Sequence, residues 1–178
     1  MDKQKHGDPI VGEKIILRPL TLADTGLIVN WRNQPFIIDK MIKRTPLTAA
    51  GHEEWVRTMI QTGKVIQFII MDKEDLRPVG STYLRDIDYD FEKAEFGVFI
   101  GEKDAQGRGF GSEAAALMLA FAFGELGLHK VCLRLLAENH AALRSYEKAG
   151  FVREAYLKDE VKPDGVFHDI ILMSVIRN

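Results

Sequence analysis

Apolar residues recur along this chain with two different periods, and the period changes several times. Short runs rich in β-branched and aromatic residues are typical of strands, and they lie at residues 14–20, 65–71, 78–87, 93–100, 130–137, 151–161 and 166–176. Apolar residues at three- and four-residue steps are typical of amphipathic helices, which we expect at residues 24–32, 48–62, 112–126 and 141–149. The three consecutive strands between residues 65 and 100 predict an antiparallel meander.

This order of elements predicts an α/β (α+β) domain with a mixed, mostly antiparallel sheet of about seven strands, flanked by about four helices. A chain of 178 residues is of the usual size for one domain. Residues 1–12 are mostly polar, so we expect a mobile lead-in there, followed by one domain over residues 13–178.

Charge and cysteine content exclude several classes of protein. The formal net charge of −2 leaves no basic face of the kind that nucleic-acid-binding domains carry, so we expect no nucleic-acid partner. A single cysteine, Cys132, permits no internal disulfide and fits the reducing cytoplasm. No apolar run is long enough to cross a bilayer, and residues 1–12 lack the apolar core of a signal peptide. We therefore expect a cytoplasmic protein without membrane contact.

The sharpest chemical signal is a glycine-rich segment between a predicted strand and the longest predicted helix. Its residues are Gln106, Gly107, Arg108, Gly109, Phe110 and Gly111. Glycines allow a backbone to approach a ligand closely, because no Cβ intervenes. The start of a helix offers free N–H groups and the positive end of a dipole, which suits a pyrophosphate. Arg108 would add a positive charge at the rim.

Three other kinds of segment are rich in glycine: P-loops, dinucleotide-binding turns and plain turns. A P-loop needs Lys-Ser or Lys-Thr after its last glycine, which this segment lacks. A dinucleotide-binding turn needs G-x-G-x-x-G directly after a strand, whereas the spacing here is G-x-G-x-G and the strand ends about six residues earlier. Glu138 does end the next predicted strand, as a dinucleotide fold would require. Glycines that merely form turns are the remaining alternative.

A second motif follows one strand later, from Asn139 through Tyr146 to Phe151. Asn139, Ala142 and Tyr146 share one helical face. Each has an ordinary structural explanation, because asparagine caps helices and tyrosine packs at core edges.

Together, Q-x-x-G-x-G and N-x-x-A-x-x-x-Y-x-K-x-G-F resemble the GCN5-related N-acetyltransferase superfamily. The resemblance favours the branch of ribosomal-protein N-terminal acetyltransferases, with a looser similarity to N-acetyltransferases of nucleotide-linked amino sugars. It covers most of the chain and is strongest over residues 95–151. It implies a sheet with a splayed central pair of strands, opened by a β-bulge in the strand before the glycine loop, and acetyl-CoA as donor without a metal.

The resemblance also implies roles for individual residues. Tyr146 would protonate the departing thiolate, and Glu95 would take the proton of the amine, directly or through water. The strand before the loop would contact the pantetheine arm through its backbone, the loop would hold the pyrophosphate, and the second motif would complete the cofactor site. These cofactor-binding residues are Val98, Phe99, Ile100, Gln106, Gly107, Arg108, Gly109, Phe110, Gly111, Ser112, Asn139, Ala142, Tyr146 and Lys148.

The acceptor is expected to be a small primary amine such as a nucleotide-linked amino sugar. The residues implied are Trp31, Arg32, Asn33 and Glu54, with Trp31 stacking on a base or sugar and Arg32 pairing with a phosphate. The alternatives are a protein amino terminus, a polyamine held by carboxylates such as Glu54 and Asp86, and a non-catalytic module that only binds acyl-CoA. Whether the chain forms a homodimer is left open.

Overall fold

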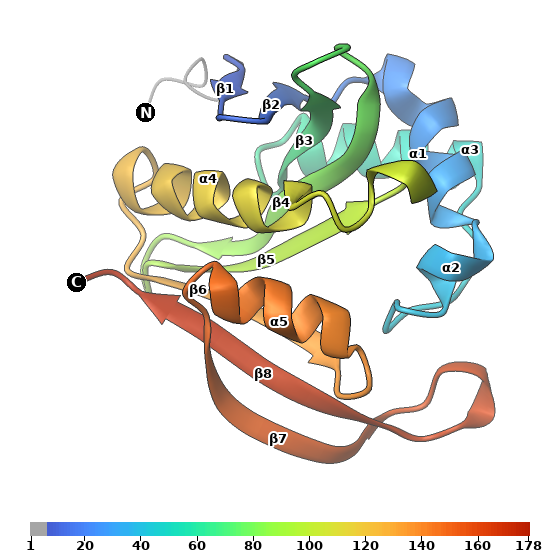
Figure 1. Cartoon of the computed structure of the whole chain (residues 1–178), viewed down its shortest axis with the longest axis vertical. Coiled ribbons are helices and arrows are strands. Elements are labelled where there is room, and N and C mark those ends of the chain that lie inside the picture. Colours follow the sequence, from blue (N-terminus) through green and yellow to red (C-terminus); the bar gives the residue numbers. More distant parts are fainter. Residues whose placement is uncertain (1–6) are drawn as a thin grey trace.

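Eight strands form one mixed sheet with helices on both faces, in the computed structural model that describes residues 7–178 (Figure 1). The strand order is β1-β2-β3-β4-β5-β6-β8-β7, and β5–β6 is the one parallel pair among neighbours that are otherwise antiparallel. The strands are β1 (Ile10–Val11), β2 (Ile15–Pro19), β3 (Ile66–Asp72), β4 (Pro78–Asp88), β5 (Lys93–Ile100), β6 (Lys130–Leu136), β7 (Val152–Val161) and β8 (His168–Ile176). The helices are α1 (Thr25–Arg32), α2 (Pro35–Ile38), α3 (Ala49–Trp55), α4 (Phe110–Gly124) and α5 (His140–Lys148).

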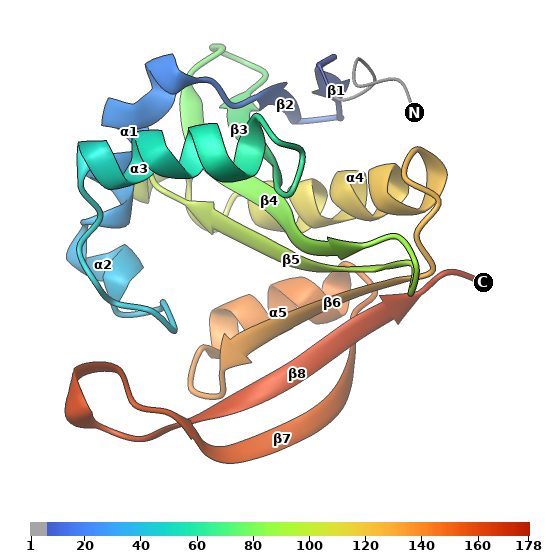
Figure 2. The ribbon, with the colours of Figure 1, turned by 180° about the vertical axis from the view of Figure 1, so that it is seen from behind.

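Two apolar clusters hold the layers together. Helices α4 and α5 cover one face of the sheet, and α1 and α3 cover the other (Figures 1 and 2). The first cluster includes Phe68, Phe96 and Met118 and joins α4 and α5 to the strands. The second joins α1 to the opposite face, where Trp31 and Phe99 are buried together. The α/β class, the mixed sheet and the meander of β3, β4 and β5 are confirmed.

The two central strands separate soon after they begin. Strands β5 and β6 pair at three positions, the last of which joins Glu95 to Cys132. Beyond it, β5 continues alongside β4, and β6 continues alongside β8. The expected splayed pair is therefore present. The parallel ladder joins β5 and β6 only where both strands begin, and they diverge from there.

The expected β-bulge is not in the splayed part of β5. The ladder between β4 and β5 is continuous from Gly80↔Ile100 to Arg85↔Glu95. Its register shifts between Arg85 and Asp88, where Asp86 has a φ of 50°. The strands open because β5 and β6 each follow a different neighbour.

Several element bounds differ from the expected ones. Helix α4 begins at Phe110 and not at Ser112, because Gly109 adopts a φ of 87° and serves as its N-cap. Strand β1 pairs with β2 inside the expected lead-in, so residues 10–11 belong to the sheet. Residues 1–6 lie outside the described part of the chain. A proline at its first position starts the short helix α2, which the apolar pattern did not predict.

The described residues contain neither a membrane-spanning helix nor a metal-binding group. No helix within residues 7–178 is long and apolar enough to cross a membrane. In the same part of the chain, no group of three or more His, Cys, Asp and Glu side chains is placed to hold a metal ion.

Candidate active site

The glycine-rich loop ends directly in the first turn of α4. Gly107 and Gly109 have φ values of 76° and 87°, which residues with a Cβ rarely adopt. The first amides of a helix have no partner within it, so those of Phe110, Gly111 and Ser112 are free to bind an anion. A bond of 3.1 Å from Gln106 Nε2 to the carbonyl oxygen of Ile100 fixes the loop to the end of β5.

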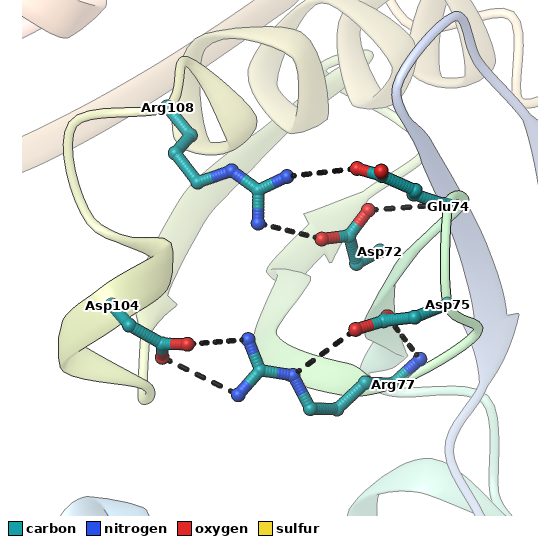
Figure 3. Close-up of polar contacts among 6 residues, drawn as sticks. All are labelled: Asp72, Glu74, Asp75, Arg77, Asp104 and Arg108. Carbon is teal, nitrogen blue, oxygen red and sulfur yellow. Dashed lines mark hydrogen bonds and ion pairs between the residues drawn. The ribbon is translucent and has the colours of Figure 1, made fainter.

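Arg108 pairs with a carboxylate at the end of β3 and with another in the turn that follows (Figure 3). Its Nη1 lies 2.7 Å from Asp72 Oδ2, and its Nη2 lies 3.6 Å from Glu74 Oε2. Arg77 continues this network with a bond of 2.8 Å to Asp104, just before the glycine loop. The structure does not support Arg108 as a free charge at the rim, because its guanidinium is already paired and holds the loop in place.

An open cavity of about 570 Å³ lies beside the loop. It is lined by Glu13, Lys14, Asp72, Lys73, Glu74, Arg108 and Phe110. None of these residues belongs to β5, β6 or α5, so the cavity is not the opening between the splayed strands. It lies on the side of the loop that faces β2 and β3.

The free edge of β5 presents backbone groups to the splayed opening. The amide of Gly101 bonds to the carbonyl oxygen of Val79 on the β4 side. Because alternate residues of a strand direct their backbone groups to opposite edges, those of Phe96, Val98 and Ile100 point toward β6. The expectation for Phe99 needs correction, since its backbone faces β4 and its side chain is buried under α1.

Helix α5 borders the opening from the other side. Asn139 Oδ1 accepts a bond of 3.3 Å from the amide of Ala142, so this side chain caps the helix and leaves Nδ2 as a donor. Ser112 Oγ and Ser145 Oγ lie 2.8 Å apart and join the first turn of α4 to the second half of α5. Lys148 is exposed at the end of α5.

Tyr146 has a buried ring whose hydroxyl is accessible. The ring packs against Phe96 and Phe151, with centroids 6.1 Å and 5.8 Å away. No described residue forms a hydrogen bond with its Oη. Because this oxygen is not one of the fully enclosed polar atoms that lack a partner, it reaches the solvent. Burial, and to a lesser extent the charge of Tyr83, raises the pKa of Tyr146. The phenol therefore stays protonated at neutral pH and has a proton to give.

Glu95 lies where the two strands part and is held by Arg85. Arg85 Nη2 lies 2.5 Å from Glu95 Oε1, across the ladder between β4 and β5. The other oxygen, Oε2, accepts no bond from a described residue. Burial raises the pKa of the neighbouring Cys132 thiol, so this cysteine stays a neutral thiol.

Tyr83 is a site residue that the sequence analysis missed. It lies opposite Gly97 in the ladder, and a Cβ added to Gly97 would be 2.2 Å from Tyr83 Cζ. The ring therefore crosses over β5 on the face that α1 covers, close enough to contribute to the raised pKa of Tyr146. A tyrosine and a glycine on separate strands give no signal in the sequence, because only strand pairing brings them together.

The expected acceptor residues do not act as a group. Trp31 is 1% exposed, lies under Gly101 and donates from Nε1 to Glu102 at 2.7 Å, so it cannot stack on a ligand. Asn33 exchanges two bonds of 2.8 Å with the backbone of Leu47. Glu54 is exposed on α3. Arg32 lies near Tyr83 and Arg85 and alone remains next to the site.

Comparison with known proteins agrees with this geometry. The family described as acetyltransferase (GNAT) domain matches residues 14–152. Spermidine N(1)-acetyltransferase of Vibrio cholerae is 27% identical over 168 residues, which are 94% of this chain and 96% of the relative. Its crystal structure with CoA and spermine has a TM-score of 0.85 at 28% identity, and the match covers 93% of this chain and 96% of that one.

The expected ribosomal branch has weaker support. YdaF of Bacillus subtilis, named for ribosomal N-acetylation, is 29% identical over 98 residues, 55% of this chain and 53% of its own.

This chain thus has the splayed strands, the helix that starts at the glycine loop and the tyrosine on α5. It also matches these enzymes over most of its length. The chain belongs to the GNAT family of acetyltransferases and is an acetyl-CoA-dependent N-acetyltransferase.

Proposed function

We propose that the chain transfers the acetyl group directly to a small primary amine, without an acetylated enzyme intermediate. The observation that carries this proposal is the opening between β5 and β6, with the accessible hydroxyl of Tyr146 beside it. Cys132, the only candidate thiol nucleophile, lies at the narrow end of the splay as a neutral thiol. Direct attack by the amine requires no nucleophile from the protein.

Acetyl-CoA supplies a thioester, and attack by the amine forms the new C–N bond as the C–S bond breaks. The amides at the start of α4 bind the pyrophosphate, and Asn139 Nδ2 donates to the pantetheine arm. A backbone N–H on the free edge of β5 stabilises the oxyanion, which is worth about 3–4 kcal/mol in comparable sites. Tyr146 gives its proton to the departing thiolate, and the proton that the nitrogen loses on becoming an amide returns to Tyr146 through water.

The amine must lose a proton before it attacks, since an alkylammonium has a pKa of about 10. Glu95 acts in this step through a water bound to Oε2, because Arg85 occupies Oε1. Arg85 keeps Glu95 in position at the point where the strands part.

The relatives support a polyamine as acceptor more than a nucleotide-linked amino sugar. Spermidine acetylation is what the Vibrio cholerae relative is named for, and one structure of that enzyme is described as dodecameric. Assembly of this chain into a larger oligomer is therefore part of the proposal. Acetylation of ribosomal protein termini rests on a match to only about half of the chain.

A thiol-release assay over a panel of amines, with wild type and Tyr146→Phe, tests this function. We expect Tyr146→Phe to bind acetyl-CoA as tightly as wild type and to lose about 10²–10⁴-fold in kcat, which is the usual contribution of a positioned acid. Isothermal titration with acetyl-CoA provides the binding control. Unchanged turnover would remove Tyr146 from the reaction, and release of free thiol without an acetylated amine would refute the transfer.

A further inference from the structure

Arg32 carries a positive charge in a partly buried position without a partner. Its Nε is enclosed and makes no hydrogen bond, and no carboxylate within residues 7–178 pairs with its guanidinium. Burial lowers the pKa of Arg32, followed by smaller effects of the nearby Tyr83 and Arg85. A guanidinium keeps its charge in proteins, so the cost of this burial is uncompensated.

The other arginines show that this is unusual for the chain. Eight of them pair with a carboxylate: Arg18, Arg44, Arg57, Arg77, Arg85, Arg108, Arg134 and Arg153. The remaining two, Arg144 and Arg177, are exposed and solvated. Among the described residues, Arg32 is thus the arginine that is both partly buried and unpaired. An arginine in this state is suited to bind an anionic ligand.

Tyr83 connects Arg32 to the place of acetyl transfer. Its ring crosses Gly97 on the free part of β5, and Arg85 lies 5.9 Å from the ring centroid. Tyr83 is also close enough to influence the pKa values of both Arg32 and Tyr146. Tyr83 and Arg85 project to the face that carries α1, whereas α5 brings Tyr146 from the opposite face. An anion held at Arg32 would therefore lie on the acceptor side of the opening.

Three carboxylates on this face are already engaged, whereas Glu54 on α3 is exposed and forms no ion pair with a described residue. Arg85 holds Glu95, Arg18 holds Asp24 at 2.7 Å, and Trp31 donates to Glu102. A polyamine would need several free carboxylates close together, but the unpaired side chain next to Tyr83 and Arg85 is the cation of Arg32. We infer that Arg32, with the Tyr83 hydroxyl and Arg85, binds an anionic group, a carboxylate or a phosphate, that the acceptor amine carries.

The inference rests on the proposed acetyl transfer, and matched acceptors test it. Glucosamine 6-phosphate is compared with glucosamine, leucine with leucinamide, and spermidine serves as the polycation. We expect kcat/KM to be about 10- to 100-fold higher for the anionic member of at least one pair, the usual strength of a charged hydrogen-bonded contact. Arg32→Gln should remove this advantage and leave the neutral member within about twofold.

Arg57→Gln is the matched control, because Arg57 is exposed and pairs with Glu53 on α3. A second measurement does not depend on finding the acceptor. Inorganic phosphate, against sodium chloride of equal ionic strength, is added to wild type, Arg32→Gln and Arg57→Gln saturated with CoA, and thermal unfolding is followed. We expect phosphate to raise the Tm of wild type and Arg57→Gln but not that of Arg32→Gln.

The two proposals fail in different ways. Preference for spermidine that Arg32→Gln leaves unchanged, or equal stabilisation of all three proteins by phosphate, would overturn the anion site and leave acetyl transfer intact. Failure of acetyl-CoA to bind, or absence of thiol release with every amine, would instead refute the proposed function.

Discussion

Gly97 is the position where a single methyl group should test the placement of Tyr83 most directly. Its φ is not positive, so the backbone of β5 accepts alanine without strain. The added Cβ would lie 2.2 Å from Cζ, 2.4 Å from Oη and 2.6 Å from Cε2 of Tyr83, whereas ordinary contacts begin at 3.4 Å. The ring must therefore move by at least about 1 Å, away from β5.

The magnitude follows from two opposing effects. Overpacking of this kind costs about 1–3 kcal/mol. Replacing glycine by alanine in a strand returns about 0.5–1 kcal/mol. We expect Gly97→Ala to lower the free energy of unfolding by about 1–2 kcal/mol. For a chain of this length, each kcal/mol lowers the Tm by about 2–4 °C.

Urea unfolding of wild type, Gly97→Ala, Tyr83→Ala and the double variant measures the effect. Removing the ring removes the clash, so the double variant should be more stable than the sum of the single effects predicts, by at least about 1 kcal/mol. Gly124→Ala in α4 is the control, because its Cβ would meet nothing within 4 Å, and alanine there should stabilise the chain. Additive effects of Gly97→Ala and Tyr83→Ala would show that the ring does not lie over Gly97.

Three further predictions concern charges and the glycine loop. Asp24→Asn should lower the free energy of unfolding at pH 7 by about 1–3 kcal/mol. Burial raises the pKa of Asp24, but hydrogen bonds from Arg18 and Thr21 outweigh burial and lower the pKa. The stability that Asp24 contributes is therefore present above pH ~4 and is lost as the pH falls through the lowered pKa. If urea titrations showed that Asp24→Asn costs the same free energy at every pH, this prediction would be contradicted. Asp72→Asn should cost about 1–2 kcal/mol by releasing Arg108 and should raise the KM for acetyl-CoA, and an unchanged KM would separate this ion pair from cofactor binding. Gly109→Ala, at a φ of 87°, should cost about 1–2 kcal/mol in thermal unfolding, and wild-type stability would show that the loop does not need glycine there.

The loop and the helix cap proposed to bind the cofactor could be predicted from the sequence because their determinants are local. A glycine that must adopt positive φ, the free amides of the turn that follows and an asparagine that caps a helix all act within a few residues of each other. The pattern therefore predicted the loop from Gln106 to Gly111 and the capped helix at Asn139. The sequence pattern predicted the start of α4 two residues too late. Several glycines precede the helix, and only the backbone φ decides which of them is the N-cap.

The acceptor half was decided by the tertiary structure. The predicted role of Trp31 in stacking is wrong because its ring fits under Gly101. On the donor side, Arg108 is not the expected free charge at the rim, because Asp72 at the end of β3 pairs with it. Tyr83 and Arg32 come together only through strand register and the position of α1.

The sequence by itself thus determined most of the helices and strands, the motifs that indicate the family and the loop proposed to hold the donor, because periodicity and backbone conformation are short-range properties. The tertiary structure decided which side chains are buried, paired or left free on the acceptor side. Burial and charge pairing depend on residues distant in the chain, such as Tyr83 beside Gly97 and Arg32 without a carboxylate, and no local pattern encodes them.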